Sequence, residues 1–247
     1  MRMRILLVGG SGYVGTMVIP HLKKDFELRV LDPAPPKDAS VDYVSGSALD
    51  PATVRRALEG MEAVVHMVIG RNPDGSYAMG DIDLNYDLNV KSLHRVLDAA
   101  CEAGIRRAAA TSTMSVHGHR PNGFPEGEDT PCDARDVYGF TKGLAEQVCG
   151  YFARVRGMTV VALRLNMPVP VEDWHGNCRP GRPNTHTAAP DVASAIALSL
   201  TVPLTGLHIL AISGDYEGKF LNCARAKHIL GWEPRERPRA SRVVSGL

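Results

Sequence analysis

Tyr138 and Lys142, four residues apart, are the side chains in this chain best suited to moving a proton. On a helix this spacing places both of them on one face. A phenol with its ordinary pKa of about 10 is a poor base at neutral pH, but a nearby cation favours the phenolate and brings it into working range. A hydroxyl-rich run, Thr111-Ser112-Thr113, lies upstream. Together these residue types predict proton transfer to or from a hydroxyl group.

A second stretch near the start of the chain could bind a phosphate, because a short apolar run breaks there into Gly9, Gly10, Gly12 and Gly15. Glycines at a strand-to-helix turn let backbone amides approach a phosphate closely. Two registers fit, G-x-G-x-x-G from Gly10 and G-x-x-G-x-x-G from Gly9, and spacing does not choose between them. Asp32 follows after about twenty residues, where a carboxylate accepts hydrogen bonds from the ribose hydroxyls of NAD and repels the 2′-phosphate of NADP. The turn therefore predicts NAD as the cofactor.

The elements that must position these groups alternate between strand-like and helix-like segments. Predicted strands cover 5–8, 27–31, 42–45, 63–69, 107–111, 159–165 and 207–212, and predicted helices cover about 13–24, a segment from Asp50, 88–103, 137–156 and 191–200. Such alternation indicates βαβ units, hence an α/β fold with a Rossmann-type, doubly wound parallel sheet. Ligands of these sheets bind outside the carboxyl ends of the strands. The glycine turn, Asp32, His66 and the hydroxyl run all lie at such ends.

The chain changes character from Met167 onwards, where prolines and glycines interrupt it frequently. This pattern predicts a small, loop-rich C-terminal lobe that binds substrate. We therefore divide the chain into an NAD-binding domain over 1–166, a small substrate-binding lobe over 167–234 that is interleaved with the sheet, and a solvated tail over 235–247.

Composition excludes several other classes of protein. The 247 residues carry a formal net charge of +1, so no global field attracts nucleic acid or an anionic membrane. The five cysteines are odd in number and never form C-x-x-C, which argues against a disulfide framework or a zinc site and fits a reducing cytoplasm. His117 and His119 have no further ligand close in sequence, so no metal is expected. Neither a signal peptide nor a membrane span is visible. We expect a cytoplasmic protein with a small-molecule ligand.

The sequence resembles the extended short-chain dehydrogenase/reductases, the NAD-dependent epimerase/dehydratase family. The similarity covers nearly the whole chain: the glycine turn, the acid after the second strand, "VVHMV", "NVKSLHRVLDAA", "TSTMSVHG", "YGFTK", "LRLN", "PDVASAI" and "LGWEP". It implies the register that begins at Gly9. The residues it places at the cofactor are Gly9, Gly12, Tyr13, Val14, Gly15, Asp32, Met67, Tyr138 and Lys142.

The resemblance also implies roles around the reacting carbon. Tyr138 is the expected acid/base, and Lys142 is expected to hold the nicotinamide ribose and tune Tyr138. Thr113 takes the place of the family's usual serine, and Asn89 matches an asparagine in the helix behind the site. Some positions depart from the family pattern: Ser47 stands where an aspartate is common, and Met67 and Val68 replace small residues.

Three reactions occur in this family, and the residues after Thr113 separate them. Dehydratases generally carry Thr-Asp-Glu where this chain has Thr113-Met114-Ser115, so elimination of water is not expected. A nucleotide-sugar epimerase with tightly bound NAD stays open, although the lobe is small for it. A non-catalytic dinucleotide sensor also stays open. The closest similarity is to uronate dehydrogenases, which implies oxidation of a sugar or sugar acid. Expected substrate contacts are Ser112, Met114, Ser115, Asn166 and Arg182, with Arg179 as the rival arginine.

The resemblance finally implies a homodimer. In the family, the helices that correspond to 89–103 and 137–156 pair across a two-fold axis.

Overall fold

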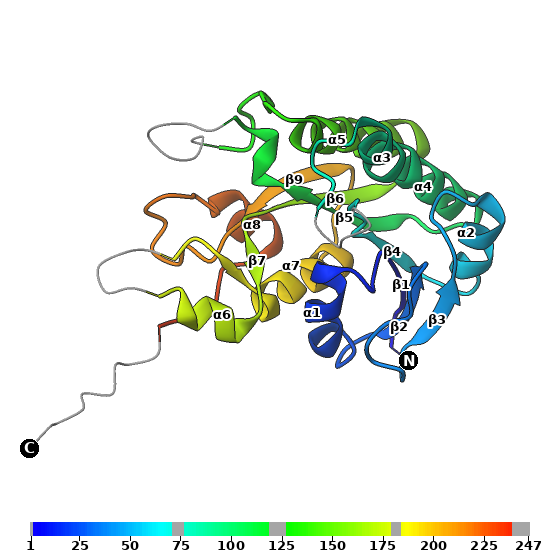
Figure 1. Cartoon of the computed structure of the whole chain (residues 1–247), viewed down its shortest axis with the longest axis horizontal. Coiled ribbons are helices and arrows are strands. Elements are labelled where there is room, and N and C mark those ends of the chain that lie inside the picture. Colours follow the sequence, from blue (N-terminus) through cyan, green and yellow to red (C-terminus); the bar gives the residue numbers. More distant parts are fainter. Residues whose placement is uncertain (1, 71–76, 119–126, 179–183, 239–247) are drawn as a thin grey trace, which may run out of the picture.

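The computed structural model describes residues 2–70, 77–118, 127–178 and 184–238. Its centre is a seven-stranded parallel sheet in the order β3-β2-β1-β4-β5-β6-β9, with helices on both faces (Figure 1). The strands are β1 (Arg4–Val8), β2 (Glu27–Asp32), β3 (Asp42–Ser45), β4 (Ala63–His66), β5 (Arg107–Thr113), β6 (Thr159–Leu165) and β9 (Leu207–Ile212). The predicted doubly wound α/β fold is confirmed.

Helices cover the sheet in two layers, and each layer has its own apolar core. One core contains side chains of α1 (Tyr13–Leu22) and α7 (Ala189–Thr201), and the other contains side chains of α2 (Pro51–Leu58), α4 (Ser92–Glu102) and α5 (Val137–Arg156). The long helix α5 has clear start and stop signals. The Asp136 carboxylate accepts a hydrogen bond from the Gly139 amide at 2.7 Å, and Gly157 ends the helix at φ +64°.

Three elements differ from the sequence prediction. The strand expected over 63–69 ends at His66, while β5 extends two residues further than expected and pairs Thr113 with Leu165 of β6. That extension carries Thr113 to the carboxyl edge of the sheet. The helix expected over 88–103 begins earlier as α3 (Ile82–Asn85) and passes through a π-helical segment, Tyr86–Lys91, before α4. π-helical turns of this kind occur frequently at functional sites.

The residues after β6 combine sheet elements with short lobe elements. β9 and α7 belong to the main sheet and its cover, whereas a two-stranded parallel ribbon joins β7 (Pro168–Val169) to β8 (Thr187–Ala188). Two short helices, α6 (Val171–Gly176) and α8 (Ala224–Leu230), complete this part, and a 3-10 turn, η2 (Met114–Val116), follows β5.

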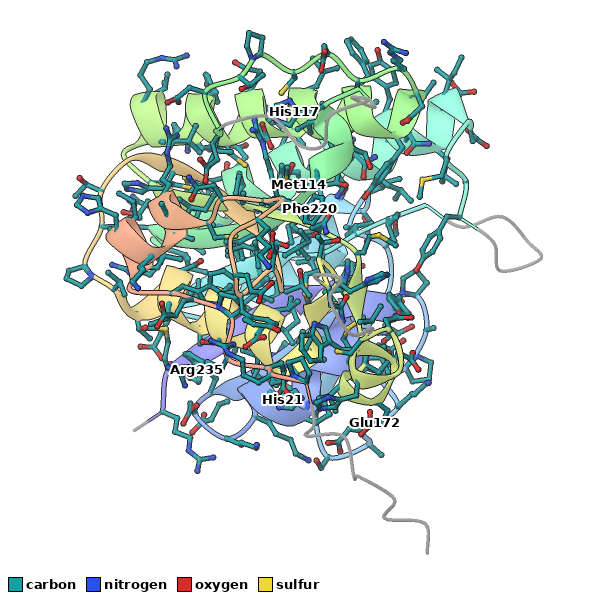
Figure 2. All side chains as sticks on the ribbon, turned by 90° about the vertical axis from the view of Figure 1, so that its left-hand side faces the viewer. His21, Met114, His117, Glu172, Phe220 and Arg235 are labelled. Atoms are coloured by element: carbon teal, nitrogen blue, oxygen red, sulfur yellow. The ribbon has the colours of Figure 1, made fainter. Side chains whose placement is uncertain are left out.

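The first residues of the expected solvated tail are attached to the fold by backbone hydrogen bonds. The amides of Arg235 and Glu236 donate to the Asp191 carboxylate at 2.9 and 3.3 Å. The Trp232 indole donates to the Asp191 carbonyl at 3.0 Å. Asp191 at the start of α7 therefore binds this segment to the fold, and Figure 2 marks Arg235 where the anchored stretch begins.

Candidate active site

The glycine turn between β1 and α1 is held by backbone geometry that needs glycine at two points. Gly9 has φ +80°, and its amide donates to the Leu31 carbonyl at 2.9 Å. A Cβ on Gly15 would lie 2.2 Å from the Gly10 carbonyl oxygen. Left-handed backbone and close approach both favour glycine. These observations support the register that begins at Gly9, while Gly10 is required for a different reason, since its Cβ would crowd the Val30 side chain.

The amide end of α1 and the Asp32 carboxylate lie on the same edge of the sheet. Gly12 is the N-cap of α1, and no side chain caps it, so the first-turn amides keep donors available for an anion. Asp32 ends β2, and its two carboxylate oxygens accept from the amides of Ser11 at 3.2 Å and Ala34 at 3.0 Å. Uncapped amides suit a pyrophosphate and a carboxylate suits ribose hydroxyls, so the residues of this edge fit a dinucleotide.

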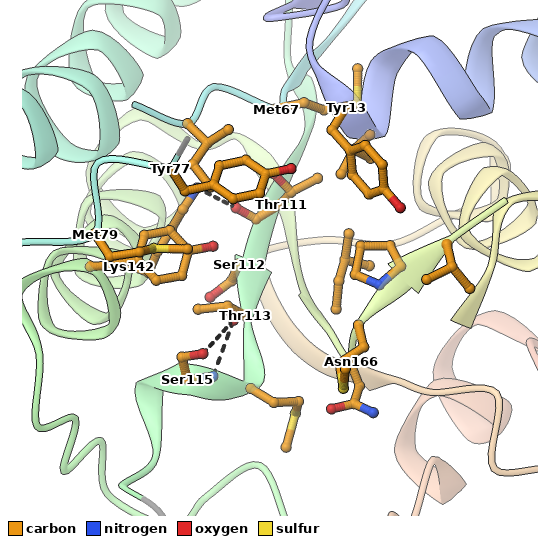
Figure 3. A pocket seen from close by; sticks show the side chains of 18 of the residues that line it. Tyr13, Met67, Tyr77, Met79, Thr111, Ser112, Thr113, Ser115, Lys142 and Asn166 are labelled. Carbon is orange, nitrogen blue, oxygen red and sulfur yellow. Dashed lines mark hydrogen bonds between the residues drawn. The ribbon is translucent and has the colours of Figure 1, made fainter. Parts of the chain in front are cut away.

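A cavity of about 490 Å³ opens beside this turn (Figure 3). Of the residues expected at the cofactor, Tyr13, Val14 and Met67 line it. Three of the four residues expected to take part in chemistry, Thr113, Tyr138 and Lys142, line it as well, and so do the expected substrate contacts Ser112, Met114, Ser115 and Asn166. The structure therefore brings together residues from β1–α1, β5, α5 and the end of β6.

The Lys142 ammonium is fixed in a buried position next to Tyr138. Its Nζ atom donates to the carbonyls of Val68 at 3.2 Å and Thr111 at 3.0 Å, and it lies 5.9 Å from the centroid of the Tyr138 ring. The Thr113 hydroxyl lies close enough to the Tyr138 phenol to lower its pKa. Thr113 Oγ1 also accepts the Ser115 amide at 3.1 Å, which fixes its orientation.

Burial shifts the acidity of both groups away from neutral pH. Burial raises the pKa of Tyr138 to about 12, and the nearby Thr113 hydroxyl opposes that change. Burial lowers the pKa of Lys142 to about 8, and the Cys149 and Glu146 side chains oppose that change. In the protein alone the phenol is therefore protonated, and a further positive charge is needed to release its proton near pH 7.

Asn89 does not line the cavity and lies behind it, in the π-helical segment. Its amide nitrogen donates to Asn85 Oδ1 and to Thr141 Oγ1, both at 3.0 Å. Thr141 lies between Tyr138 and Lys142 on α5, so Asn89 joins the π-helical segment to the helix that carries both residues. Its amide oxygen is buried and has no hydrogen-bond partner in the described part of the chain.

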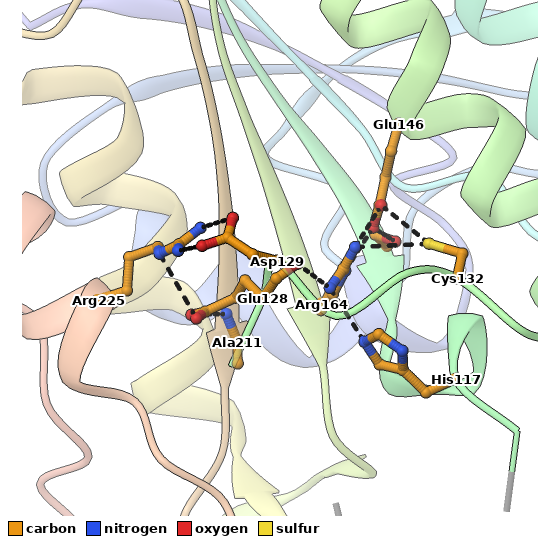
Figure 4. A network of polar contacts seen from close by, with 9 residues as sticks. His117, Glu128, Asp129, Cys132, Glu146, Arg164, Ala211 and Arg225 are labelled. Atoms are coloured by element: carbon orange, nitrogen blue, oxygen red, sulfur yellow. Dashed lines mark hydrogen bonds and ion pairs between the residues drawn. The ribbon is translucent and has the colours of Figure 1, made fainter. Parts of the chain in front are cut away.

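Ser112 lines the cavity, and its hydroxyl is hydrogen-bonded within the protein. It donates to Glu146 Oε1 at 2.6 Å. Arg164 of β6 donates to both carboxylate oxygens of Glu146 at 2.8 Å, so the pair is bidentate (Figure 4). Arg164 also donates to the Glu128 carbonyl at 3.0 Å. The expected substrate role of Ser112 stays a prediction, and the structure adds that its hydroxyl proton is donated to Glu146.

Sequence reasoning missed several residues of this region. Glu146 lies four residues after Lys142 on the same helix, so the i, i+4 spacing could have identified it. Tyr77, Met79 and His186 line the cavity from distant loops, and no sequence signal marks them. The two arginines considered for substrate binding, Arg179 and Arg182, lie outside the described residues.

Other expectations concern groups away from the cavity. His66 forms a 2.8 Å hydrogen bond with Ser92 Oγ, and burial lowers its pKa to about 3, so it is a neutral, packed side chain. Across residues 2–70, 77–118, 127–178 and 184–238, no group of three His, Cys, Asp or Glu side chains is arranged to hold a metal ion. None of the helices in the described ranges has the length and apolar character needed to cross a membrane.

Comparison with known proteins places these observations in context. Residues 5–181 match the sequence model of the NAD dependent epimerase/dehydratase family. The chain is 32% identical over 151 residues to an N-acetyl-alpha-D-glucosaminyl-diphospho-ditrans,octacis-undecaprenol 4-epimerase of Escherichia coli O157:H7, covering 58% of this chain and 42% of that protein. It is 27% identical over 174 residues to an L-arabinose 1-dehydrogenase (NAD(P)(+)) of Haloferax volcanii, covering 66% of each. The match spans about two fifths of the first curated relatives.

Solved structures show the same fold at low sequence identity. A mutated uronate dehydrogenase superposes with a TM-score of 0.80 at 17% identity, covering 96% of this chain and 82% of that one. A UDP-N-acetylglucosamine 4-epimerase from Bacillus cereus superposes with a TM-score of 0.77 at 18% identity, covering 95% and 92%. The fold is therefore shared by dehydrogenases and epimerases alike.

Proposed function

Because the chain belongs to the NAD dependent epimerase/dehydratase family, we propose that it is an NAD-dependent dehydrogenase that oxidises a hydroxyl-bearing carbon of a sugar or sugar acid. One observation carries the proposal. Thr113, Tyr138 and Lys142 face a single cavity at the carboxyl edge of the sheet, beside the uncapped amide end of α1.

The glycine turn and Asp32 are the residues that would hold NAD. Amides of the first turn of α1 would bind the pyrophosphate, and the Asp32 carboxylate would accept the adenosine ribose hydroxyls. A 2′-phosphate would meet the negative charge of Asp32, so we expect NAD to be preferred over NADP. NAD, when bound, supplies the hydride acceptor and a positive charge that favours the phenolate of Tyr138.

Three side chains of this chain would handle the substrate hydroxyl. The Tyr138 phenolate takes the hydroxyl proton, Thr113 orients the same oxygen through its hydroxyl, and the Lys142 ammonium stabilises the phenolate. Lys142 is suited to this role because two carbonyls fix its ammonium in place without neutralising its charge. Asn89 acts from behind by positioning the first turns of α5 through Thr141.

A nucleotide-sugar 4-epimerase is the second candidate function. It is supported by the 32% identity to an epimerase, and the same three side chains would remove and return the proton. An epimerase returns its hydride to the sugar, so it produces no net reduced cofactor. The two functions therefore differ in a directly measurable quantity.

The test is to follow the absorbance of reduced nicotinamide with NAD and, separately, with NADP. The panel holds galacturonate, glucuronate, neutral aldoses and UDP-sugars, and the UDP-sugar reactions are also analysed for product configuration. Net NADH with a free sugar or sugar acid supports the dehydrogenase. An inverted UDP-sugar without net NADH would replace it with the epimerase. Bound NAD with no reaction on any compound would favour a sensor.

We further propose that the protein is a homodimer of the cytoplasm. Phe140, Tyr151 and Val155 are exposed on one face of α5, eleven and four residues apart, and Tyr86 is exposed on the neighbouring π-helical segment. An exposed apolar stripe at helical spacing is suited to burial against a second helix pair. A molar mass by light scattering equal to one chain would contradict the dimer.

A further inference from the structure

We propose that the substrate presents a hydrocarbon surface next to its reacting hydroxyl, as a deoxy sugar or an O-alkyl sugar does, and that a wall formed by Tyr77, Met79, Met114, Met167 and Pro168 binds that surface. This inference rests on the proposed dehydrogenase function and narrows its substrate class. The name "apolar wall" is kept below for these five residues, all of which line the cavity.

Several apolar side chains at the mouth of the cavity are exposed to solvent. Met167 is 57% exposed, Met79 is 39% exposed, and Tyr77 and Tyr13 are each 38% exposed. Exposed apolar groups gathered at one place mark a binding surface. Tyr13 follows the glycine turn and belongs to the cofactor side, whereas Figure 3 shows Tyr77 and Met79 on the side of Lys142. Unbranched, polarisable methionines adapt well to a hydrocarbon ligand.

The polar groups of the cavity are largely used by the protein itself. Ser112 donates to Glu146, the Asn166 amide donates to the Thr185 carbonyl at 2.7 Å, and His186 Nδ1 is hydrogen-bonded to Asn184 at 3.0 Å. A buried hydroxyl of a ligand that finds no partner weakens binding. A sugar with its full set of hydroxyls would therefore leave several unpaired, while a deoxy or O-alkyl sugar would not.

The charged side chains that line the cavity also favour such a substrate. Among its described lining residues the single cation is Lys142, and two carbonyls already accept from its ammonium. In this part of the chain, then, a carboxylate or a diphosphate would have no counter-charge at the cavity wall. A neutral substrate fits these residues better than an anionic one.

Met167, a residue of the apolar wall, has a strained backbone conformation. Met167 has φ +42°, which is the left-handed region that glycine tolerates and other residues rarely adopt. Thr187 holds this conformation, because its amide donates to the Met167 carbonyl at 3.2 Å and its hydroxyl donates to the Asn166 carbonyl at 2.7 Å. Strain of this kind persists at functional sites. The methionine side chain at this position therefore has a use that glycine would not serve.

The test compares matched substrates that differ only in hydrocarbon content. One pair is D-galactose and 6-deoxy-D-galactose, and the other is 6-O-methyl-D-galactose and 6-O-butyl-D-galactose, which keep the hydroxyl at C1 free. We expect kcat/KM with NAD to be at least about tenfold higher for the deoxy sugar, and to rise by up to about fourfold for each added methylene, from about 0.8 kcal/mol per buried CH2. A preference for D-galactose or galacturonate would overturn the inference and leave the dehydrogenase standing.

Binding is measured separately, so that failure of the reaction and failure of the inference are distinguishable. Calorimetry with the Tyr138→Phe protein saturated with NADH ranks the same pairs without turnover. Tighter binding of the hydrocarbon-rich member supports the apolar wall even when no compound is oxidised, an outcome that would refute only the reaction. Equal or weaker binding of that member overturns the inference.

Two variants locate the preference at the apolar wall. Met167→Gly relieves the backbone strain, so the protein should be at least as stable as the parent, while the ratio of kcat/KM within each pair falls several-fold. Met79→Gln should lower that ratio similarly. The matched control is Ile82→Gln, which changes an exposed apolar residue outside the cavity and should leave the ratio unchanged. An unchanged ratio in both wall variants contradicts the proposal.

Discussion

Two polar clusters meet at the carboxyl end of β5, and each takes one of two adjacent residues from that strand. The cavity cluster contains Thr113, and the buried cluster contains Ser112 with Glu146 and Arg164. Successive residues of a strand face opposite sides, so the single step from Ser112 to Thr113 moves from one cluster to the other. In the buried cluster, Arg164 and Glu146 have side chains only 3% and 2% exposed, and two 2.8 Å contacts join them.

The clusters differ in how completely their charges are satisfied. Glu146 meets a bidentate guanidinium and a serine hydroxyl, which is the condition under which a buried carboxylate is tolerated. Among the described residues no opposite charge lies at contact distance from Tyr138 or Lys142, and both groups carry shifted pKa values. The buried cluster ties α5 to β5 and β6, and α5 carries the cavity residues. The buried cluster therefore fixes α5 in position, and the cavity cluster keeps its groups reactive.

The largest effect is expected at the cavity cluster, where Tyr138→Phe should lower kcat/KM by about 10²- to 10⁴-fold, the range for loss of a positioned acid/base. The free energy of unfolding and the Kd for NAD should change little, because only a half-buried hydroxyl is removed. Steady-state kinetics and NAD titration measure both. Tyr151→Phe, on the same helix but outside the cavity, is the control and should keep parental activity. Retained activity in Tyr138→Phe would refute the acid/base role.

The next effect belongs to the buried cluster and should appear in stability. Arg164→Met leaves the Glu146 carboxylate buried without its partner, which costs about 3–5 kcal/mol of unfolding free energy. Urea denaturation measures this loss, and the double variant Arg164→Met with Glu146→Leu should regain much of it. Lys227→Met is the control, because its pair with Glu233 is exposed and its loss should cost less than about 1 kcal/mol. Equal losses in the two single variants would remove the distinction between buried and exposed pairs.

A smaller effect follows from the pKa of Lys142, which burial lowers from 10.5 to about 8. Between those values the unfolded chain binds more protons than the folded protein, so this group makes stability rise with pH, by at most about 1.4 kcal/mol per pH unit. Lys142→Met lacks this contribution. The variant should therefore be the more stable protein at pH 7, and its advantage should shrink from pH 8 to pH 9.5.

The quantity to measure is the difference in unfolding free energy between the parent and Lys142→Met at each pH. The parent alone does not isolate Lys142, because burial also raises the pKa values of Cys149 and Cys223 to about 12. Those thiols lower stability as pH rises. The Lys142 charge lowers the pKa of Cys149, so its loss strengthens the Cys149 effect in the variant and adds to the shrinking of the variant's advantage. Lys91→Met, at an exposed helix pair, is the control and should show a constant difference. A constant difference for Lys142→Met as well would show that Lys142 is not desolvated.

The fold was largely predictable because its signals are local and repeated. Apolar runs, glycine turns and proline starts define each strand and helix separately, so the parallel sheet follows from their alternation. The errors are at the ends of elements. The π-helical segment before α4 contains no residue type that marks it, since it depends on Asn85 and Asn89 meeting Ala78 and α5.

The site residues that belong to short sequence motifs could be predicted from the sequence. The cavity residues that come from loops could not. Tyr138 and Lys142 share one helix, and Thr113 ends one strand, so spacing identifies them. Tyr77 and His186 line the same cavity from two separate loops. Their positions depend on how those loops cross the edge of the sheet. The contacts of Ser112 could not be predicted from the sequence either. The sequence shows that Ser112 carries a hydroxyl, but the partner of that hydroxyl depends on which face of β5 it lies on.

The smallest predicted effect is also the one that tests the two-cluster comparison most directly. Ser112→Ala removes the hydrogen bond to Glu146 while the bidentate pair with Arg164 remains, so the unfolding free energy should fall by about 1 kcal/mol, and kcat/KM should stay within about threefold of the parent. Ser199→Ala is the matched control, since Ser199 is also buried and donates at 2.7 Å to the Ala195 carbonyl on its own helix. If Ser112→Ala instead lost activity by a hundredfold at parental stability, its hydroxyl would belong to the substrate, and the division of β5 into a reactive and a structural face would be wrong.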